Sequence, residues 1–165
     1  MAVNGANGAL LWKRATRNEV FGSAVFQDIT NDGIKDVFMV GRQAQLLAIN
    51  GASGALLWDF FPYNNINPAD SGLYNFYNPQ FIADVSGDGL MDLLVANGGD
   101  HAAPVWDTTR PPGHLMVVNS LNGHVIAKAV VPDSAETYCS PLVADIQGNG
   151  VQWVLYGTGG ETLGG

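Results

Sequence analysis

Two short motifs alternate along this chain of 165 residues and constrain its fold more than any other feature. The first motif reads Asn-Gly-Ala-Asn-Gly-Ala-Leu-Leu-Trp at residues 4–12. It recurs almost unchanged at residues 50–58 and more loosely at residues 119–127, where Ala127 replaces the tryptophan. Repetition at such spacing indicates that the chain is built from copies of one supersecondary unit.

The second motif is an aspartate-rich segment of nine residues. It reads Asp-Ile-Thr-Asn-Asp-Gly-Ile-Lys-Asp at 28–36 and Asp-Val-Ser-Gly-Asp-Gly-Leu-Met-Asp at 84–92. A third copy at 145–153 keeps the first aspartate but ends in Trp153. Each copy is followed within the same repeat by a copy of the first motif, except the third.

Short apolar runs connect the motifs and end at Gly, Asn-Gly or Asn-Ser, as β-strands in a turn-rich protein do. No window of ten or more residues has a helical period, and 21 glycines supply many tight turns. The sequence therefore predicts an all-β fold of β-propeller blades with four antiparallel strands, A to D. The aspartate segment joins A to B, and the Asn-Gly turn joins C to D. The runs lie at 37–40, 46–49, 93–96, 115–118 and 153–156.

The repeats predict a single β-propeller-type repeat domain over residues 1–165, with two complete blades and one blade split between the termini. Three blades are fewer than the about four to eight of a usual ring. Either the chain is a fragment of a longer propeller, or the two halves join between subunits. The expected parts are strands C and D of the split blade at 1–14, blade one at 21–60, blade two at 76–131, and strands A and B of the split blade at 138–156.

The aspartate segments have the composition of calcium-binding loops. Ca²⁺ takes about six to eight oxygen ligands, and alternate residues of a tight loop can supply them around a central glycine. The expected ligands of the first loop are Asp28, Thr30, Asp32, the Ile34 carbonyl and Asp36. Those of the second loop are Asp84, Ser86, Asp88, the Leu90 carbonyl and Asp92. A weaker third site would use Asp145, Gln147, Asn149 and the Val151 carbonyl, without a closing aspartate.

Two other interpretations of these loops compete with calcium binding. Asp-Gly pairs also form ordinary hairpin turns without any ion, but two full copies at equivalent places of a repeat favour calcium. An EF-hand requires flanking helices and a Glu at loop position 12. That position holds Met39 and Val95, inside apolar strand-like runs, so an EF-hand is excluded.

The loops, with Phe21-Gly22 before the first and Val40-Gly41 after it, resemble FG-GAP (VCBS-type) repeats, the blades of integrin α-subunit propellers. The segment from Ala48 to Trp58 is also similar to the quinoprotein blade signature, with Asn50 and Ser53 in place of Asp and Thr. The resemblance implies calcium binding by the residues named above and a secreted or cell-surface protein. Thr30 and the third loop depart from the FG-GAP pattern.

The net charge and the motifs present in the sequence disfavour several classes of function. The net charge of −8 disfavours nucleic acid as a partner, and no apolar stretch is long enough for membrane insertion. No catalytic motif occurs, so we expect a non-enzymatic, calcium-stabilised structural or adhesive module. The alternative is the scaffold fragment of a longer propeller enzyme or receptor whose active residues lie outside this chain.

Partners are expected at two kinds of place. The long loops 62–75 and 98–113 could bind a protein or carbohydrate ligand. The unpaired strands of the two half-blades predict a homo-oligomer, in which residues 1–14 of one subunit complete the blade at 138–156 of the next. Such head-to-tail contacts close into a ring or continue as a filament.

Overall fold

The computed structural model describes residues 1–64, 74–99, 104, 107, 109, 111–133 and 137–158. Their regular structure consists of antiparallel β-sheets and one helical turn, α1 (Phe60–Tyr63), which the sequence did not predict. No helix among the described residues is long and apolar enough to cross a membrane. The prediction of an all-β fold is confirmed.

Two of the sheets have four strands in sequential order, as expected for propeller blades. Blade one comprises β3 (Val25–Gln27), β4 (Asp36–Val40), β5 (Leu46–Ile49) and β6 (Leu56–Asp59). Blade two comprises β7 (Phe76–Ile82), β8 (Asp92–Asn97), β9 (His114–Val118) and β10 (Val125–Val130). β4 and β8 are the second strands of their sheets, and their side chains are mostly buried because neighbours cover both faces.

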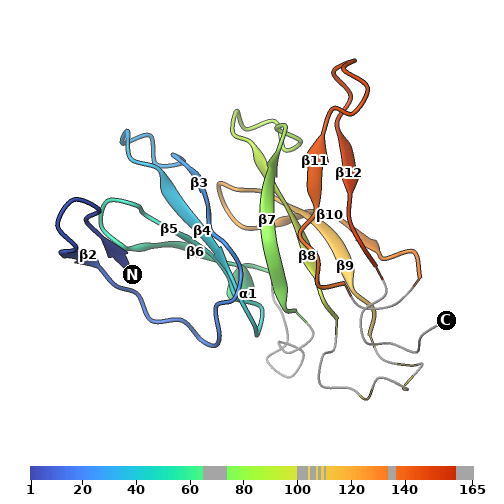
Figure 1. Ribbon diagram of the computed structural model, residues 1–165, viewed down its shortest axis with the longest axis horizontal. Helices are drawn as coiled ribbons and strands as arrows, with labels where there is room; N and C mark the ends of the chain where they lie inside the picture. Colours follow the sequence, from blue (N-terminus) through green and yellow to red (C-terminus); the bar gives the residue numbers. More distant parts are fainter. Residues whose placement is uncertain are drawn as a thin grey trace.

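The other two sheets have two strands each. One pairs β1 (Ala2–Val3) with β2 (Leu10–Trp12), and the other pairs β11 (Leu142–Ala144) with β12 (Trp153–Leu155). They lie at opposite ends of the row of sheets, and the three aspartate loops all project from one side of that row (Figure 1). β7 contacts both β3 and β11, so the first strands of successive blades are neighbours.

The hydrophobic core lies between the two complete blades. Phe38 and Phe76 are fully buried, and their rings contact aromatic rings from other parts of the chain. Phe38 meets Phe81 edge-on at a centroid distance of 5.5 Å, and Phe60 meets Phe76 in the same way at 4.7 Å. Edge-to-face contacts of this kind stabilise a core beyond the area that they bury.

Tryptophans link each blade to the next. The indole N–H of Trp12 donates to the carbonyl of Gly51 at 2.8 Å, and its ring covers Gly54 in the turn of blade one. Trp58 donates in the same way to Ser120 at 2.8 Å and covers Gly123. In the copies at 50–58 and 119–127, the first repeat motif therefore forms a turn, and the tryptophan of the preceding copy packs on that turn.

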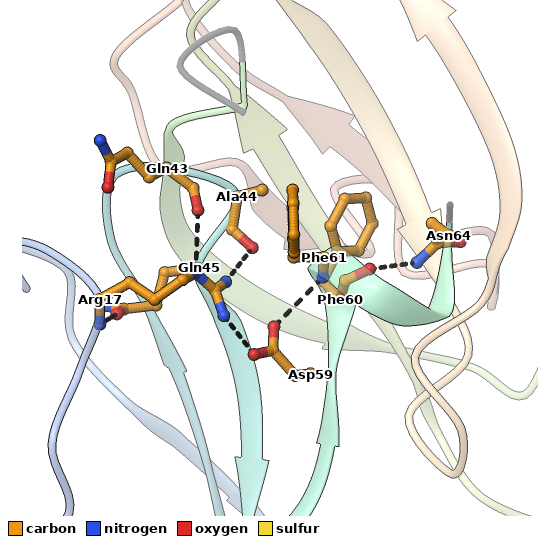
Figure 2. A network of polar contacts seen from close by, with 8 residues as sticks. All are labelled: Arg17, Gln43, Ala44, Gln45, Asp59, Phe60, Phe61 and Asn64. Atoms are coloured by element: carbon orange, nitrogen blue, oxygen red, sulfur yellow. Dashed lines mark hydrogen bonds and ion pairs between the residues drawn. The ribbon is translucent and has the colours of Figure 1, made fainter. Parts of the chain in front are cut away.

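Arg17 also connects the segment after β2 to blade one (Figure 2). Its guanidinium donates to the carbonyls of Gln43 and Ala44 and pairs with Asp59. Its backbone N–H donates to Gln45, whose side chain is fully buried. Gln43 and Ala44 have positive φ angles of 58° and 54°, so Arg17 caps the carbonyls of a strained turn.

Candidate functional site: the aspartate loops

The first loop is shaped by hydrogen bonds from its own backbone to its aspartates. Asp28 accepts the N–H groups of Asp32 at 3.2 Å and Gly33 at 2.8 Å. Asp32 in turn accepts the N–H of Ile34 at 2.8 Å. Gly33 has a φ of +84°, which a residue with a Cβ rarely adopts. The aspartates and the central glycine therefore fix the curl of the loop.

The closing aspartate of this loop is buried rather than exposed. The side chain of Asp36 has no solvent exposure, and one of its oxygens accepts the N–H groups of Ile29 at 2.9 Å and Thr30 at 3.0 Å. Its other oxygen accepts the N–H of Gly51 at 3.0 Å. Asp36 therefore joins the start of its loop to the Asn-Gly turn of the same blade.

The second loop repeats this geometry. Asp84 accepts the N–H groups of Gly87 at 2.6 Å and Gly89 at 2.8 Å. The fully buried Asp92 accepts those of Val85 and Ser86, both at 2.8 Å. The N–H of Leu90 donates to Asp88 at 3.0 Å. Equivalent positions thus adopt similar local structure in both complete blades, although Asp84 accepts the N–H of Gly87 where Asp28 accepts that of Asp32.

A hydroxyl lies between two carboxylates in each loop. The Oγ of Ser86 is 3.2 Å from Oδ1 of Asp84 and 3.2 Å from Oδ1 of Asp92. The corresponding distances from Oγ1 of Thr30 to Asp28 and Asp36 are 3.4 and 3.5 Å. A hydroxyl has one hydrogen to donate, so it cannot fully satisfy both carboxylate oxygens.

The third carboxylate of each loop is directed to an asparagine of the first repeat motif. Asn50 donates to Asp32 at 3.3 Å, and Asn119 donates to Asp88 at 2.8 Å. These asparagines were not among the ligands expected from the sequence. A signal was present, because an asparagine opens every copy of the first motif, but its contact with the aspartate loop is non-local.

The oxygen donors suit a hard cation such as Ca²⁺, since all are carboxylates, hydroxyls or carbonyls. Within the described ranges, however, no group of three or more His, Cys, Asp or Glu side chains lies close enough to hold a metal ion. Each loop instead brings together two carboxylates and one hydroxyl, while the third carboxylate contacts asparagine. The residue types fit calcium by chemistry, and full coordination of such an ion would require the side chains of Asp32 and Asp88 to turn toward it.

The third loop keeps the turn but lacks the closing carboxylate. Asp145 accepts the N–H groups of Asn149 at 3.1 Å and Gly150 at 2.7 Å. The amide of Asn149 donates to Gln147 and its oxygen accepts the N–H of Val151. In place of the buried aspartate stands Trp153, which is 45% exposed. This loop offers one carboxylate.

The same backbone hydrogen bonds favour the ionised form of the loop aspartates. The pKa values of Asp32, Asp84 and Asp145 are lowered below the ordinary value of an aspartate. The largest cause in each case is a hydrogen bond from a backbone N–H of the same loop, that of Ile34, Gly89 and Gly150 respectively. These carboxylates are negatively charged at neutral pH and can attract a cation.

The sequence-predicted ligand loops 62–75 and 98–113 lie largely outside the described residues. Comparison with known proteins adds one finding on the whole chain. The model of the FAM234A/B beta-propeller family matches residues 1–163. No curated protein and no solved structure matches the chain. The match agrees with the blades described above and names no ion, ligand or activity.

Proposed function

We propose that this chain, which belongs to the FAM234A/B beta-propeller family, is a calcium-stabilised structural or adhesive module that performs no catalysis. The observation that carries the proposal is the convergence of two carboxylates on one hydroxyl in both complete blades. Two negative charges so placed repel each other, and a cation between them would remove the repulsion.

In the second loop, Asp84, Ser86 and Asp92 would hold the ion, joined by Asp88 and the carbonyl of Leu90. In the first loop the same positions are Asp28, Thr30, Asp36, Asp32 and the carbonyl of Ile34. The ion would supply positive charge directly between the carboxylates. Because Asp36 also binds the N–H of Gly51, an ion there would stiffen the contact between the aspartate loop and the Asn-Gly turn.

Calcium sites of extracellular modules bind at about 10⁻⁴–10⁻³ M, which suits the calcium concentration outside cells. This supports a secreted or cell-surface location. The long loops 62–75 and 98–113 are also places where a protein or carbohydrate ligand could bind, because binding residues are often carried on loops of a scaffold.

The test is thermal unfolding of the full chain in chelator and across a calcium titration, with magnesium as the control ion. Binding to the folded state alone adds about 2.7 kcal/mol per site at a hundredfold excess over the dissociation constant. We expect a marked rise in melting temperature with calcium and a smaller rise with magnesium, which binds flexible oxygen cages less readily. An unchanged melting temperature in calcium would overturn the proposal.

A further inference from the structure

We propose that the cavity between α1 and blade two binds a small organic acid, with its carboxylate at Lys128 and its apolar part against Phe60 and Met116. The ligand class is a single ring or short branched chain that carries one carboxylate. None of the residues that line the cavity belongs to an aspartate loop. This proposal and the calcium proposal can therefore fail separately.

The cavity lies where blade one hands over to blade two, and it has a volume of about 220 Å³. An apolar cavity of about 150 Å³ can hold a benzene molecule. The space beside α1 therefore suits a ring with a short side chain. Its described lining residues are Phe60, Asn64, Tyr74, Met116, Val125 and Lys128.

The same place in blade one also has a cavity, of about 300 Å³. The two cavities correspond because their walls include equivalent residues of the third and fourth strands. In blade one Leu47 pairs with Asp59, and in blade two Met116 pairs with Lys128. The equivalent lining residues are Leu47 with Met116, Leu56 with Val125, and Asp59 with Lys128. A cavity beside the outer strands is thus a repeated feature of the complete blades.

The two cavities differ in how their charged residue is balanced. In the first, Asp59 pairs with Arg17, which comes from the segment before blade one. In the second, Lys128 stands at the position of Asp59, and no carboxylate in the described part of the chain forms an ion pair with it. Figure 2 shows Asp59 and Asn64 at the two ends of α1, so this helical turn separates the two cavities. A ligand carboxylate would give Lys128 the counter-charge that Arg17 gives Asp59.

The walls of the second cavity are apolar and fixed in place. Phe60 has no solvent exposure and packs edge-on against Phe76, while Met116 is 2% exposed. Small-molecule sites combine walls of this kind with a small number of polar groups that orient the ligand. A methionine side chain also adapts readily to the shape of a bound group. These walls would hold the ring or branched chain of the acid.

The amide of Asn64 is already occupied by the protein. It donates to the carbonyls of Phe60 at 3.1 Å and Gly123 at 2.8 Å, and it accepts the N–H of Val125 at 3.0 Å. Asn64 therefore shapes the cavity rather than binding a ligand. Lys128 is the charged residue of the lining, and it is exposed at the mouth, where a carboxylate can keep part of its hydration.

The experiment is a titration of the full chain with 3-phenylpropionate, followed by NMR of ¹³C-labelled methionine methyl groups. The chain has four methionines, and Met116→Leu assigns the resonance of Met116. We expect this resonance to shift with a dissociation constant of about 1 mM or below. The resonance of Met91, which lies in the second aspartate loop, should stay in place. The neutral 3-phenylpropionamide and acetate should each bind about fivefold or more weakly, since one lacks the charge and the other the ring.

Two pairs of variants locate the ligand. Lys128→Gln should weaken binding of the acid by about threefold to fivefold and leave that of the amide unchanged. Lys13→Gln removes an exposed lysine that does not line the cavity, and it should have no effect. Val125→Phe should fill the cavity and weaken binding of both compounds by about tenfold. Val130→Phe is its control, because Val130 lies on the same strand, is 51% exposed and is not part of the lining.

Each outcome decides the proposal, provided that circular dichroism shows the variants to be folded. A Met116 resonance that does not move in about 20 mM 3-phenylpropionate overturns it. Equal affinity for the acid and the amide also overturns it, as does equal weakening in Lys13→Gln and Lys128→Gln. If Val125→Phe does not fold, the lysine pair and the amide still decide. The titration gives the same result in chelator and in calcium, so failure of calcium to raise the melting temperature leaves it unaffected.

Discussion

Asp36 and Asp92 are buried carboxylates that would hold their loops together even in the absence of an ion. Each accepts two backbone N–H groups at the start of its own loop, at distances between 2.8 and 3.0 Å. Asp88, by contrast, is exposed and contacts the side chain of Asn119. The closing and the central aspartate therefore contribute differently to stability with and without calcium.

This difference can be measured with two substitutions in one loop. In chelator, Asp92→Ala should lower the free energy of unfolding by about 1–3 kcal/mol, because two backbone N–H groups lose their buried acceptor. Asp88→Ala should cost less than about 1 kcal/mol there. Chemical denaturation measures both values. Equal losses in the two variants would contradict the structural role of Asp92.

Calorimetry with calcium ranks the sites. Asp36→Ala and Asp92→Ala should each remove one bound ion, since no neighbouring carboxylate replaces them. Asn149→Ala should change the count little, because the third loop offers a single carboxylate and ends in Trp153. Two calcium ions of wild-type affinity bound to Asp92→Ala would show that the second loop is wrongly assigned.

His114 gives the protein a pH dependence that is separate from the aspartate loops. Burial, with a smaller contribution from the charge of Lys128, lowers the pKa of His114 below its ordinary value of 6.5. The unfolded chain then binds a proton more readily than the folded one, so stability is complete above about pH 6.5 and falls as the pH drops below it. His114→Gln should reduce the loss of stability between about pH 7.5 and pH 5.5, measured by denaturation.

At the scale of elements, the Asn-Gly turn is the part of each blade that binds the tryptophan of the preceding copy of the motif. The last glycine of the turn, which is Gly8, Gly54 or Gly123, has a positive φ in all three copies, but the atoms around it differ. A Cβ on Gly123 would lie 2.6 Å from the ring of Trp58, whereas one on Gly8 would meet nothing. The two positions separate backbone strain from the loss of an inter-blade contact.

Gly8→Ala should therefore cost about 1 kcal/mol, the strain of a positive φ. Gly123→Ala carries the same strain and must also displace Trp58, which adds about 1–3 kcal/mol. Equilibrium unfolding of both variants measures the difference. Equal destabilisation by the two substitutions would mean that the contact of Trp58 with Gly123 contributes nothing to stability.

The strands and their order were predictable because apolar runs and turn motifs recur in the sequence. Each run favours a strand, and each turn motif favours a reversal of the chain, through interactions between residues close in sequence. The run at 93–96, for example, lies within β8, and the Asn-Gly turns join the strands that they were expected to join. The links between motifs were not predictable. Asn50 contacts Asp32 across 18 residues of sequence, and Arg17 reaches Asp59 across 42. Such contacts join residues far apart in sequence, so no short sequence pattern predicts them.

At the scale of the whole molecule, neighbouring blades are joined at two places. One is near their first strands, the inner strands, and the other is near their fourth strands, the outer strands. Near the inner strands the rings of Phe21 and Tyr77 are 5.0 Å apart, and those of Tyr77 and Tyr138 are 5.3 Å apart. Near the outer strands, Trp58 spans blades one and two. In the part of the chain that the structure describes, these contacts join neighbouring blades, as in other repeat proteins, so cooperative unfolding depends on them.

Removing one link should therefore divide the unfolding transition. Trp58 is 1% exposed, and Trp58→Ala should lower stability by about 3–5 kcal/mol. Because it separates the two complete blades, we also expect a second thermal transition in differential scanning calorimetry. Trp12→Ala, at a less buried position of the same motif, is the comparison and should leave a single transition. One sharp transition in both variants would indicate that the aromatic rings of the inner strands suffice to couple the blades.

The turn at Gly51 also places a natural optical probe beside the first aspartate loop. The N–H of Gly51 binds Asp36, and its carbonyl accepts the indole N–H of Trp12. Any rearrangement of the loop on cation uptake would alter the polarity around that indole and shift its fluorescence emission. In Trp12→Phe the spectral response to the first loop would disappear, while Trp58, whose indole N–H donates to Ser120, would still emit. The protein would thus carry its own reporter of cation binding at the first loop, and titrations could be followed without a label.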